Sequence, residues 1–113
     1  LNDATTEDAR VAGLIDLVEV IDNGDDAPGT ILETCSVAFQ HHFGAADLVI
    51  VKGQGNYESL SGVDKNIFFM LKAKCPVIAE HLGCKLNQMI LRRSDAFTGA
   101  GNFVKGGKVD AWV

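Results

Sequence analysis

The feature that most constrains this chain is a short apolar run that ends in a lysine and a glycine-rich segment. Residues 47–51 read Asp-Leu-Val-Ile-Val, and residues 52–56 read Lys-Gly-Gln-Gly-Asn. An uninterrupted run of aliphatic and β-branched residues is typical of a parallel strand that is buried on both faces of its sheet. We therefore predict a strand over residues 47–51, followed by a glycine-rich turn at its carboxyl end.

Other segments alternate between strand and helix patterns. We predict further strands over residues 17–21, 66–72 and 88–92, and helices over residues 5–14, from Ala27 onward, and over residues 77–82. Asp26 would cap the helix at Ala27, and Pro28 would occupy its first turn. The pattern between Pro28 and Phe43 fits one helix or two. Such alternation indicates an α/β fold with a mostly parallel sheet covered on both faces.

Composition sets the domain size and excludes two classes of partner. The chain has 113 residues, of which 47% are hydrophobic, and its formal net charge is -5. We expect one α/β part over residues 1–94 and a glycine-rich, loosely ordered tail over residues 95–113. The chain has no Lys/Arg-rich run and no apolar run of membrane-spanning length, so we expect neither a nucleic-acid partner nor a membrane.

The cysteines point to a reducing compartment. Cys35, Cys75 and Cys84 are odd in number and form no C-x-x-C pair, so neither a zinc ribbon nor a thioredoxin-like motif is indicated. We interpret them as small apolar residues and expect a cytoplasmic location.

Polar and glycine residues follow the strands predicted over residues 17–21 and 47–51, and they also occur at residues 1–3, which could be the end of a strand whose body lies upstream. Asn2 and Asp3 come after the first apolar residue, residues 22–26 form an acidic loop that includes Gly24, and residues 52–56 follow the clearest strand. Ligands of open α/β sheets bind beyond the carboxyl ends of the strands. We therefore expect these three segments to converge on one edge of the sheet.

Two residues at these positions carry possible chemistry. The ammonium of Lys52 beside glycine N–H groups could hold a phosphate, although a tight turn with a solvated lysine is an equal alternative. Neither a P-loop nor a dinucleotide fingerprint is complete. Asp3 offers an oxygen ligand for Mg²⁺ or Mn²⁺, although the residues alone favour a helix-capping role. Tyr57 and Glu58 could orient Lys52 or a substrate, or could simply pack.

The sequence resembles the damage-control phosphatase family, long known as domain of unknown function 89. The residues that carry the resemblance are 47–60, in which Lys-Gly-Gln-Gly-Asn-Tyr-Glu is a specific match, together with 2–5, 22–30 and 68–76. These segments occur in the family's order and cover most of residues 1–92. The form of the Lys-Gly block is similar to that of the microbial branch.

The resemblance implies a three-layer α/β/α catalytic domain that hydrolyses sugar phosphates or damaged phosphometabolites with a divalent metal, Mn²⁺, Co²⁺, Ni²⁺ or Mg²⁺. By motif matching, Asp3 corresponds to the later metal-binding aspartate, and Lys52 to the lysine that contacts the substrate phosphate. Five further residues fall in the matched segments and are candidates for phosphate binding: Asn2, Gly24, Gly53, Gly55 and Asn56.

The family's upstream D-N-x-G-E-type motif, which supplies two more metal ligands, is not in this sequence, and the chain begins with Leu1. We therefore expect an incomplete, C-terminal part of the catalytic domain that is inactive alone. An unpaired sheet edge and exposed apolar surface would favour self-association or pairing with the missing N-terminal part. The alternatives are a non-catalytic module that binds a phosphorylated ligand and, ranked lower, a carboxyl methyltransferase, because the usual glycine-rich nucleoside loop is not evident.

Overall fold

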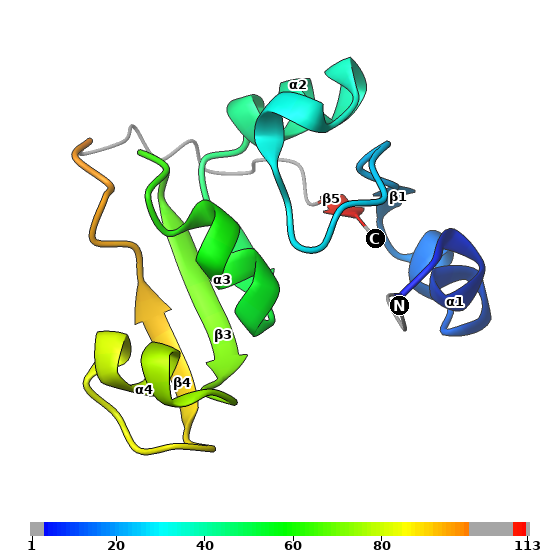
Figure 1. The fold of residues 1–113 in the computed structure, drawn as a ribbon. Helices are drawn as coiled ribbons and strands as arrows, with labels where there is room; N and C mark the ends of the chain where they lie inside the picture. The colour runs from blue at the N-terminus through cyan, green and yellow to red at the C-terminus, as the bar shows by residue number, and fades with distance from the viewer. Residues whose placement is uncertain (1–3, 100–109, 113) are drawn as a thin grey trace. The chain divides into compact units, whose positions relative to one another are not determined.

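The structure is a computed structural model that describes residues 4–99 and 110–112. In chain order the elements are α1 (Thr6–Val11), the 3-10 helix η1 (Leu14–Asp16), β1 (Glu19–Ile21), the 3-10 helix η2 (Leu32–Thr34), α2 (Val37–Ala45), β2 (Val49–Lys52), α3 (Gln54–Leu60), β3 (Ile67–Lys72), α4 (Pro76–Leu82), β4 (Met89–Arg93) and β5 (Asp110–Trp112) (Figure 1). Within the described ranges, no helix has the length and apolarity needed to cross a membrane.

The described residues divide into two compact units, and each is taken by itself. The first contains residues 4–26, 32–46 and 110–112, and the second contains residues 27–31 and 47–99.

The second unit is built on a three-stranded sheet in the order β2-β3-β4. Strands β2 and β3 run parallel, with Val51 opposite Phe69, whereas β3 and β4 run antiparallel, with Met70 opposite Leu91. All three strands fall where the sequence predicts them, and the mixed α/β class is confirmed. One of the two strand pairings in this sheet is antiparallel, so the sheet is mixed.

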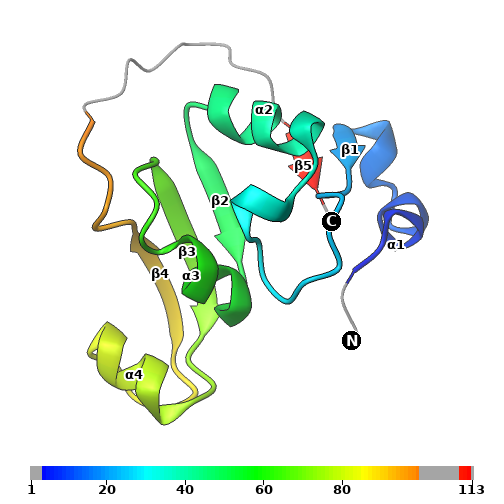
Figure 2. The same cartoon turned by 45° about the horizontal axis from the view of Figure 1, so that its top comes forward.

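The core of the second unit lies between this sheet and its two helices. In both Figures 1 and 2, α3 and α4 lie on the same side of the sheet. Alternate strand residues point to that side and are buried, namely Val49, Val51, Ile67, Phe69 and Leu71. Tyr57 and Leu60 of α3 and Ile78 of α4 are buried as well, and the Tyr57 ring contacts that of Phe69. Because side chains alternate between the faces of a strand, their sequence neighbours must point to the opposite face.

That opposite face of the sheet is apolar and exposed. Ile50 is 62% exposed, Met70 46% and Leu91 70%. The prediction that the 47–51 strand is buried on both faces is therefore wrong in this structure, because both helices of the unit pack against the other face.

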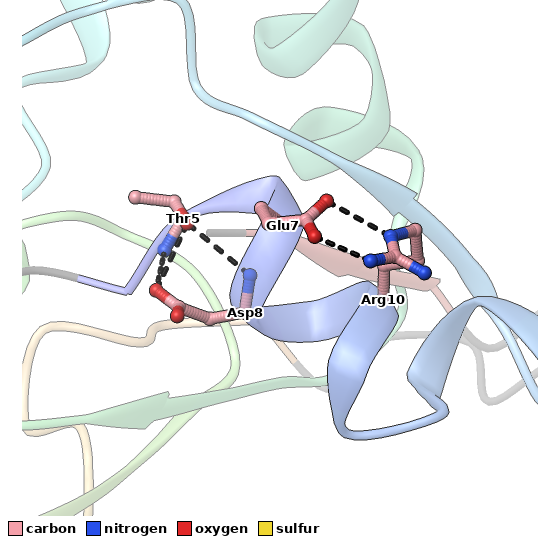
Figure 3. Close-up of polar contacts among 4 residues, drawn as sticks. All are labelled: Thr5, Glu7, Asp8 and Arg10. Atoms are coloured by element: carbon pink, nitrogen blue, oxygen red, sulfur yellow. Dashed lines mark hydrogen bonds and ion pairs between the residues drawn. The ribbon is translucent and has the colours of Figure 1, made fainter.

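In the first unit, α1 starts where its capping residues predict. The Thr5 side chain accepts a hydrogen bond from the Asp8 N–H at 3.2 Å, and the Asp8 carboxylate accepts one from the Thr5 N–H at 2.8 Å (Figure 3). This reciprocal capping box satisfies donors that a helix start leaves without partners. Glu7 and Arg10 pair one turn apart, with 2.8 Å between Glu7 Oε2 and Arg10 Nε. The helix ends at Val11, earlier than predicted.

The rest of the first unit contains a buried aromatic pair and a second small sheet. Ser36 caps α2 by accepting from the Phe39 N–H at 3.1 Å, and the Phe39 and Phe43 rings stack with centroids 6.3 Å apart. Strand β1 pairs in parallel with β5, in the segment for which the sequence predicted no strand. Cys35 is buried, and burial beside Asp25 and Glu33 raises the pKa of its thiol.

The helix predicted from Ala27 is absent, which is a correction to the sequence analysis. No helix covers residues 27–31, and the chain first becomes helical at η2. Gly29 has a φ of +73°, which is incompatible with a right-handed helix. The N–H and hydroxyl of Thr30 are also used elsewhere, in hydrogen bonds to Ser59 and Asn56 of α3.

Candidate functional site

The candidate site is the junction between β2 and α3. Lys52 is the last residue of β2 and lies opposite Met70, and the Gly53 N–H donates to the Met70 carbonyl at 2.9 Å. Helix α3 begins directly afterwards, at Gln54. The predicted turn over residues 52–56 is therefore much shorter than expected: Gly53 makes the connection, and Gly55 and Asn56 belong to the first helical turn.

The side chain of Lys52 is exposed and uncommitted. It shares the sheet face of Ile50, opposite to the face covered by α3 and α4. Among the described residues, none accepts a hydrogen bond from the ammonium or pairs with it. A lysine in this state can contact an external anion without first breaking an internal ion pair.

Asn56 fixes the backbone at this junction through both polar atoms of its side chain. Its Nδ2 donates to the Lys52 carbonyl at 2.9 Å, and its Oδ1 accepts from the Thr30 hydroxyl at 2.8 Å. An amide engaged at both ends is well suited to hold the end of β2 in place. Asn56 was predicted as a phosphate-binding residue, which stays a prediction, and this geometry adds a role in positioning the end of β2.

Residues 27–31 pack directly against the first turn of α3. A Cβ added at Gly29 would lie 2.7 Å from the Gly55 carbonyl oxygen, so the two backbones approach too closely for any side chain. The Thr30 N–H donates to the Ser59 hydroxyl at 2.9 Å. This segment therefore supports the helix that follows Lys52.

Gln54 links the end of β2 to the loop that follows β3. Its Oε1 accepts from the Lys74 N–H at 2.9 Å, and its Nε2 donates to Glu58 at 3.1 Å and approaches the Cys75 sulfur at 3.7 Å. Sequence reasoning assigned no role to Gln54, Thr30 or Ser59. The family resemblance covers them without giving them a role, because Gln54 and Ser59 lie in the matched segment 47–60 and Thr30 lies in 22–30.

Tyr57 and Glu58 were predicted either to orient Lys52 or a substrate or to pack, and Tyr57 packs. Its ring is buried and meets Phe69 edge-on with centroids 5.0 Å apart, and burial raises the pKa of its hydroxyl. The exposed Glu58 accepts a hydrogen bond from Gln54.

The remaining predicted residues lie either outside the described ranges or in the first unit. Asn2 and Asp3 lie outside the described residues. Gly24 belongs to the first unit, where a Cβ would come within 2.7 Å of Ser36 Cβ. In its loop, Asp22 accepts from the Gly24 N–H at 2.9 Å and Asn23 accepts from the Asp25 N–H at 3.0 Å. The convergence of the three polar segments stays a prediction.

The described residues do not by themselves fit a divalent metal. In residues 4–99 and 110–112, no three His, Cys, Asp or Glu side chains gather closely enough to hold an ion. Protein sites for Mg²⁺ and Mn²⁺ need several oxygen ligands. A metal at this junction would therefore depend on Asp3 and on ligands from outside the described part.

The family profile described as the damage-control phosphatase ARMT1-like domain matches residues 1–90. The chain is 47% identical over 95 residues to an uncharacterized protein of Methanocaldococcus jannaschii, covering 80% of this chain and 31% of that protein. It is 44% identical over 95 residues to a damage-control phosphatase of Pyrococcus horikoshii, covering 83% of this chain and 33% of that protein.

A solved structure agrees with these similarities. The crystal structure of a DUF89 family protein from Pyrococcus horikoshii is similar with a TM-score of 0.79 at 43% identity, covering 83% of this chain and 33% of that one. The chain thus spans about a third of the length of the relatives that it matches.

Proposed function

The chain belongs to the damage-control phosphatase ARMT1-like family, and from that membership we propose that it forms the phosphate-contacting part of a metal-dependent phosphoric monoester hydrolase. The proposed substrates are sugar phosphates or damaged phosphometabolites. By itself, we propose, this segment has little or no activity.

The observation that carries the proposal is the exposed, uncommitted ammonium of Lys52 on a fixed backbone. The ammonium would bind the phosphate and stabilise the negative charge that develops on its oxygens during transfer. Asn56 would keep Lys52 in place through the carbonyl that it holds. Both hydrogen-bond partners of the Asn56 amide are protein groups, so the Lys52 backbone is held in place before the substrate binds.

The roles that the resemblance implies are kept for Asp3 and for Asn2, Gly24, Gly53, Gly55 and Asn56. We propose Asp3 as one ligand of Mn²⁺, Co²⁺, Ni²⁺ or Mg²⁺, and the other five as residues around the substrate phosphate. When bound, such a metal would neutralise phosphate charge and activate a water. The further metal ligands would come from polypeptide outside this chain.

We propose that the exposed sheet face is covered in the intact protein, by additional polypeptide or by a second copy. The sheet of a soluble protein rarely leaves a continuous apolar face in water, but this face exposes Ile50, Met70 and Leu91. Covering them would complete a three-layer α/β/α arrangement, with α3 and α4 as one outer layer. The cysteine thiols fit a reducing location, which we propose to be the cytoplasm.

The proposal is tested by assaying the intact polypeptide and this segment side by side. The substrates are p-nitrophenyl phosphate and fructose 1-phosphate, with and without Mn²⁺ or Ni²⁺, and Asp3→Ala is the comparison variant. We expect metal-dependent turnover by the intact protein, its loss in Asp3→Ala, and little turnover by the segment. No turnover with any metal would favour a module that binds a phosphorylated ligand without hydrolysing it.

A further inference from the structure

A cavity lies in the second unit, and Lys52 is not part of its lining. It has a volume of about 440 Å³ and lies where the ends of α3, α4 and β4 meet. Its lining includes Tyr57 of α3, Ser61 directly after α3, and His81 of α4. The sheet contributes Phe69 of β3 and Arg92 of β4. It is larger than a single oxyanion requires, and a small organic molecule would fill it.

Strand direction places this cavity at the other end of the sheet from the proposed phosphate site. Lys52 ends β2, whereas Arg93, which also lines the cavity, lies opposite Phe68 at the beginning of β3. The faces differ as well, because Phe69 and Arg92 lie on the helix-covered face and Lys52 on the exposed one. The two sites share no residue.

The two arginines that line the cavity, Arg92 and Arg93, have more N–H donors than the protein acceptors around them use. A guanidinium has five N–H donors. Arg92 donates to the Leu82 carbonyl at 3.3 Å and to Asp95 at 3.2 Å, and Arg93 donates to Asn66 at 3.1 Å. The side chain of Asp95 is 83% exposed, so its ion pair with Arg92 contributes little and can be displaced at low cost.

Tyr57 gives an independent reason to expect a ligand. The residue is only 6% exposed, yet its hydroxyl makes no hydrogen bond to any of the described residues. Its ring is held edge-on by Phe69 at 5.0 Å and by His81 at 5.9 Å, which fixes the direction of the hydroxyl. Buried polar groups are normally satisfied, so a buried hydroxyl without a partner beside a cavity indicates that something outside the chain completes it.

We propose that this cavity binds a small organic anion. Its carboxylate or phosphate-like group would accept hydrogen bonds from the Tyr57 hydroxyl and the Arg92 guanidinium. Its apolar body, about the size of one ring, would rest on Phe69. The excess of donors favours an oxyanion over a neutral ligand, and the aromatic lining favours an organic anion over a bare inorganic one.

The test is a calorimetric titration of the intact polypeptide with benzoate, in which phenylphosphonate and neutral benzamide replace benzoate in parallel arms. Benzoate and phenylphosphonate distinguish a carboxylate from a phosphate-like ligand, and neither is hydrolysed. The variants are Tyr57→Phe, which keeps the ring, Arg92→Lys, which keeps a positive charge, and Lys52→Ala as the control at the other site. Thermal melts check that each variant is folded.

We expect saturable binding of at least one of the two anions and weaker binding of benzamide. Tyr57→Phe should weaken anion binding about tenfold through the loss of one hydrogen bond to a charged group. Arg92→Lys should weaken it comparably, and Lys52→Ala should leave the binding of benzoate unchanged, because a phosphonate is also a ligand for the proposed phosphate site. Absence of saturable binding, unchanged binding in both cavity variants, or benzoate binding that depends on Lys52 would overturn the proposal. None of these results bears on phosphatase activity, so the two proposals can fail separately.

Discussion

The Thr30 hydroxyl donates a 2.8 Å hydrogen bond to Asn56 Oδ1, and the same amide donates from Nδ2 to the Lys52 carbonyl at 2.9 Å. Thr30 is 2% exposed, so this contact is made away from water. A loop residue 22 positions before Lys52 in the chain therefore helps to fix the backbone that carries the proposed phosphate-binding lysine.

Replacing Thr30 by valine should destabilise the protein. The substitution keeps the shape but removes the donor, and it leaves Asn56 Oδ1 without its partner in a partly buried contact. We expect a loss of about 1–3 kcal/mol in the free energy of unfolding, measured by urea denaturation. Thr6→Val is the matched control, because Thr6 is exposed in α1 and should change stability much less. Equal losses in both variants would contradict the role given to Thr30.

Gly29→Ala should also be destabilising, for a steric reason. The new Cβ would meet the Gly55 carbonyl at 2.7 Å, and the φ of +73° disfavours any side chain. We expect a loss of about 1–3 kcal/mol. Gly44→Ala is the control: its Cβ would meet nothing within 4 Å and it lies in α2, so it should be neutral or stabilising by up to about 1 kcal/mol. A harmless Gly29→Ala would mean that residues 27–31 do not pack on α3 as described.

Asp64 should contribute to stability in a pH-dependent manner. Thr98 donates to its carboxylate from the N–H at 2.9 Å and from the hydroxyl at 2.8 Å, and these bonds lower the pKa of Asp64 from its ordinary value of 3.8. A lowered folded-state pKa gives stability that is present above the unfolded pKa and is lost as the pH falls through the folded one.

The wild type should therefore lose melting temperature more steeply than Asp64→Asn between about pH 5 and about pH 2. Thr98→Val removes one of the two donors and should fall between them. Thermal melts across this range make the comparison, and identical pH profiles for wild type and Asp64→Asn would rule out the contribution.

The exposed sheet face should be a buried interface in the intact polypeptide. Ile50→Asp would then place a charge in an apolar contact and lower the free energy of unfolding of the intact protein by about 3 kcal/mol or more. Val77→Asp is the control, since Val77 of α4 is 74% exposed and carries no such role. Thermal or chemical unfolding compares the two. If Ile50→Asp is as mild as Val77→Asp, the face is not covered.

The sequence predicted the strands better than the segments between them. The strands over 47–51 and 66–72 carry runs of β-branched and aliphatic residues, and both formed close to the predicted bounds. The residues around Ala27 have a helix-start pattern, yet Thr30 makes its hydrogen bonds with α3. A contact between residues 26 or 29 positions apart leaves no local signal, so propensity alone could not predict it.

The sequence predicted those parts of the candidate site that have a local signal. Lys52 was found because a charge directly after an apolar strand stands out in the sequence. The clamp formed by Asn56 and the link made by Gln54 depend on partners from other segments, which only the folded chain brings together. The exposure of Ile50 was mispredicted, because a strand's own sequence does not reveal whether anything covers its second face.

Phosphate binding by Lys52 is the step on which the proposed function depends. It is tested most directly by measuring kcat/KM of the intact polypeptide for p-nitrophenyl phosphate with Mn²⁺, comparing Lys52→Ala with Lys85→Ala, which removes an exposed lysine from the loop between α4 and β4. We expect Lys52→Ala to lower kcat/KM by about 100-fold to 1,000-fold and Lys85→Ala to stay close to wild type. Equal activity of the two variants, in protein that is folded and active with metal, would contradict it.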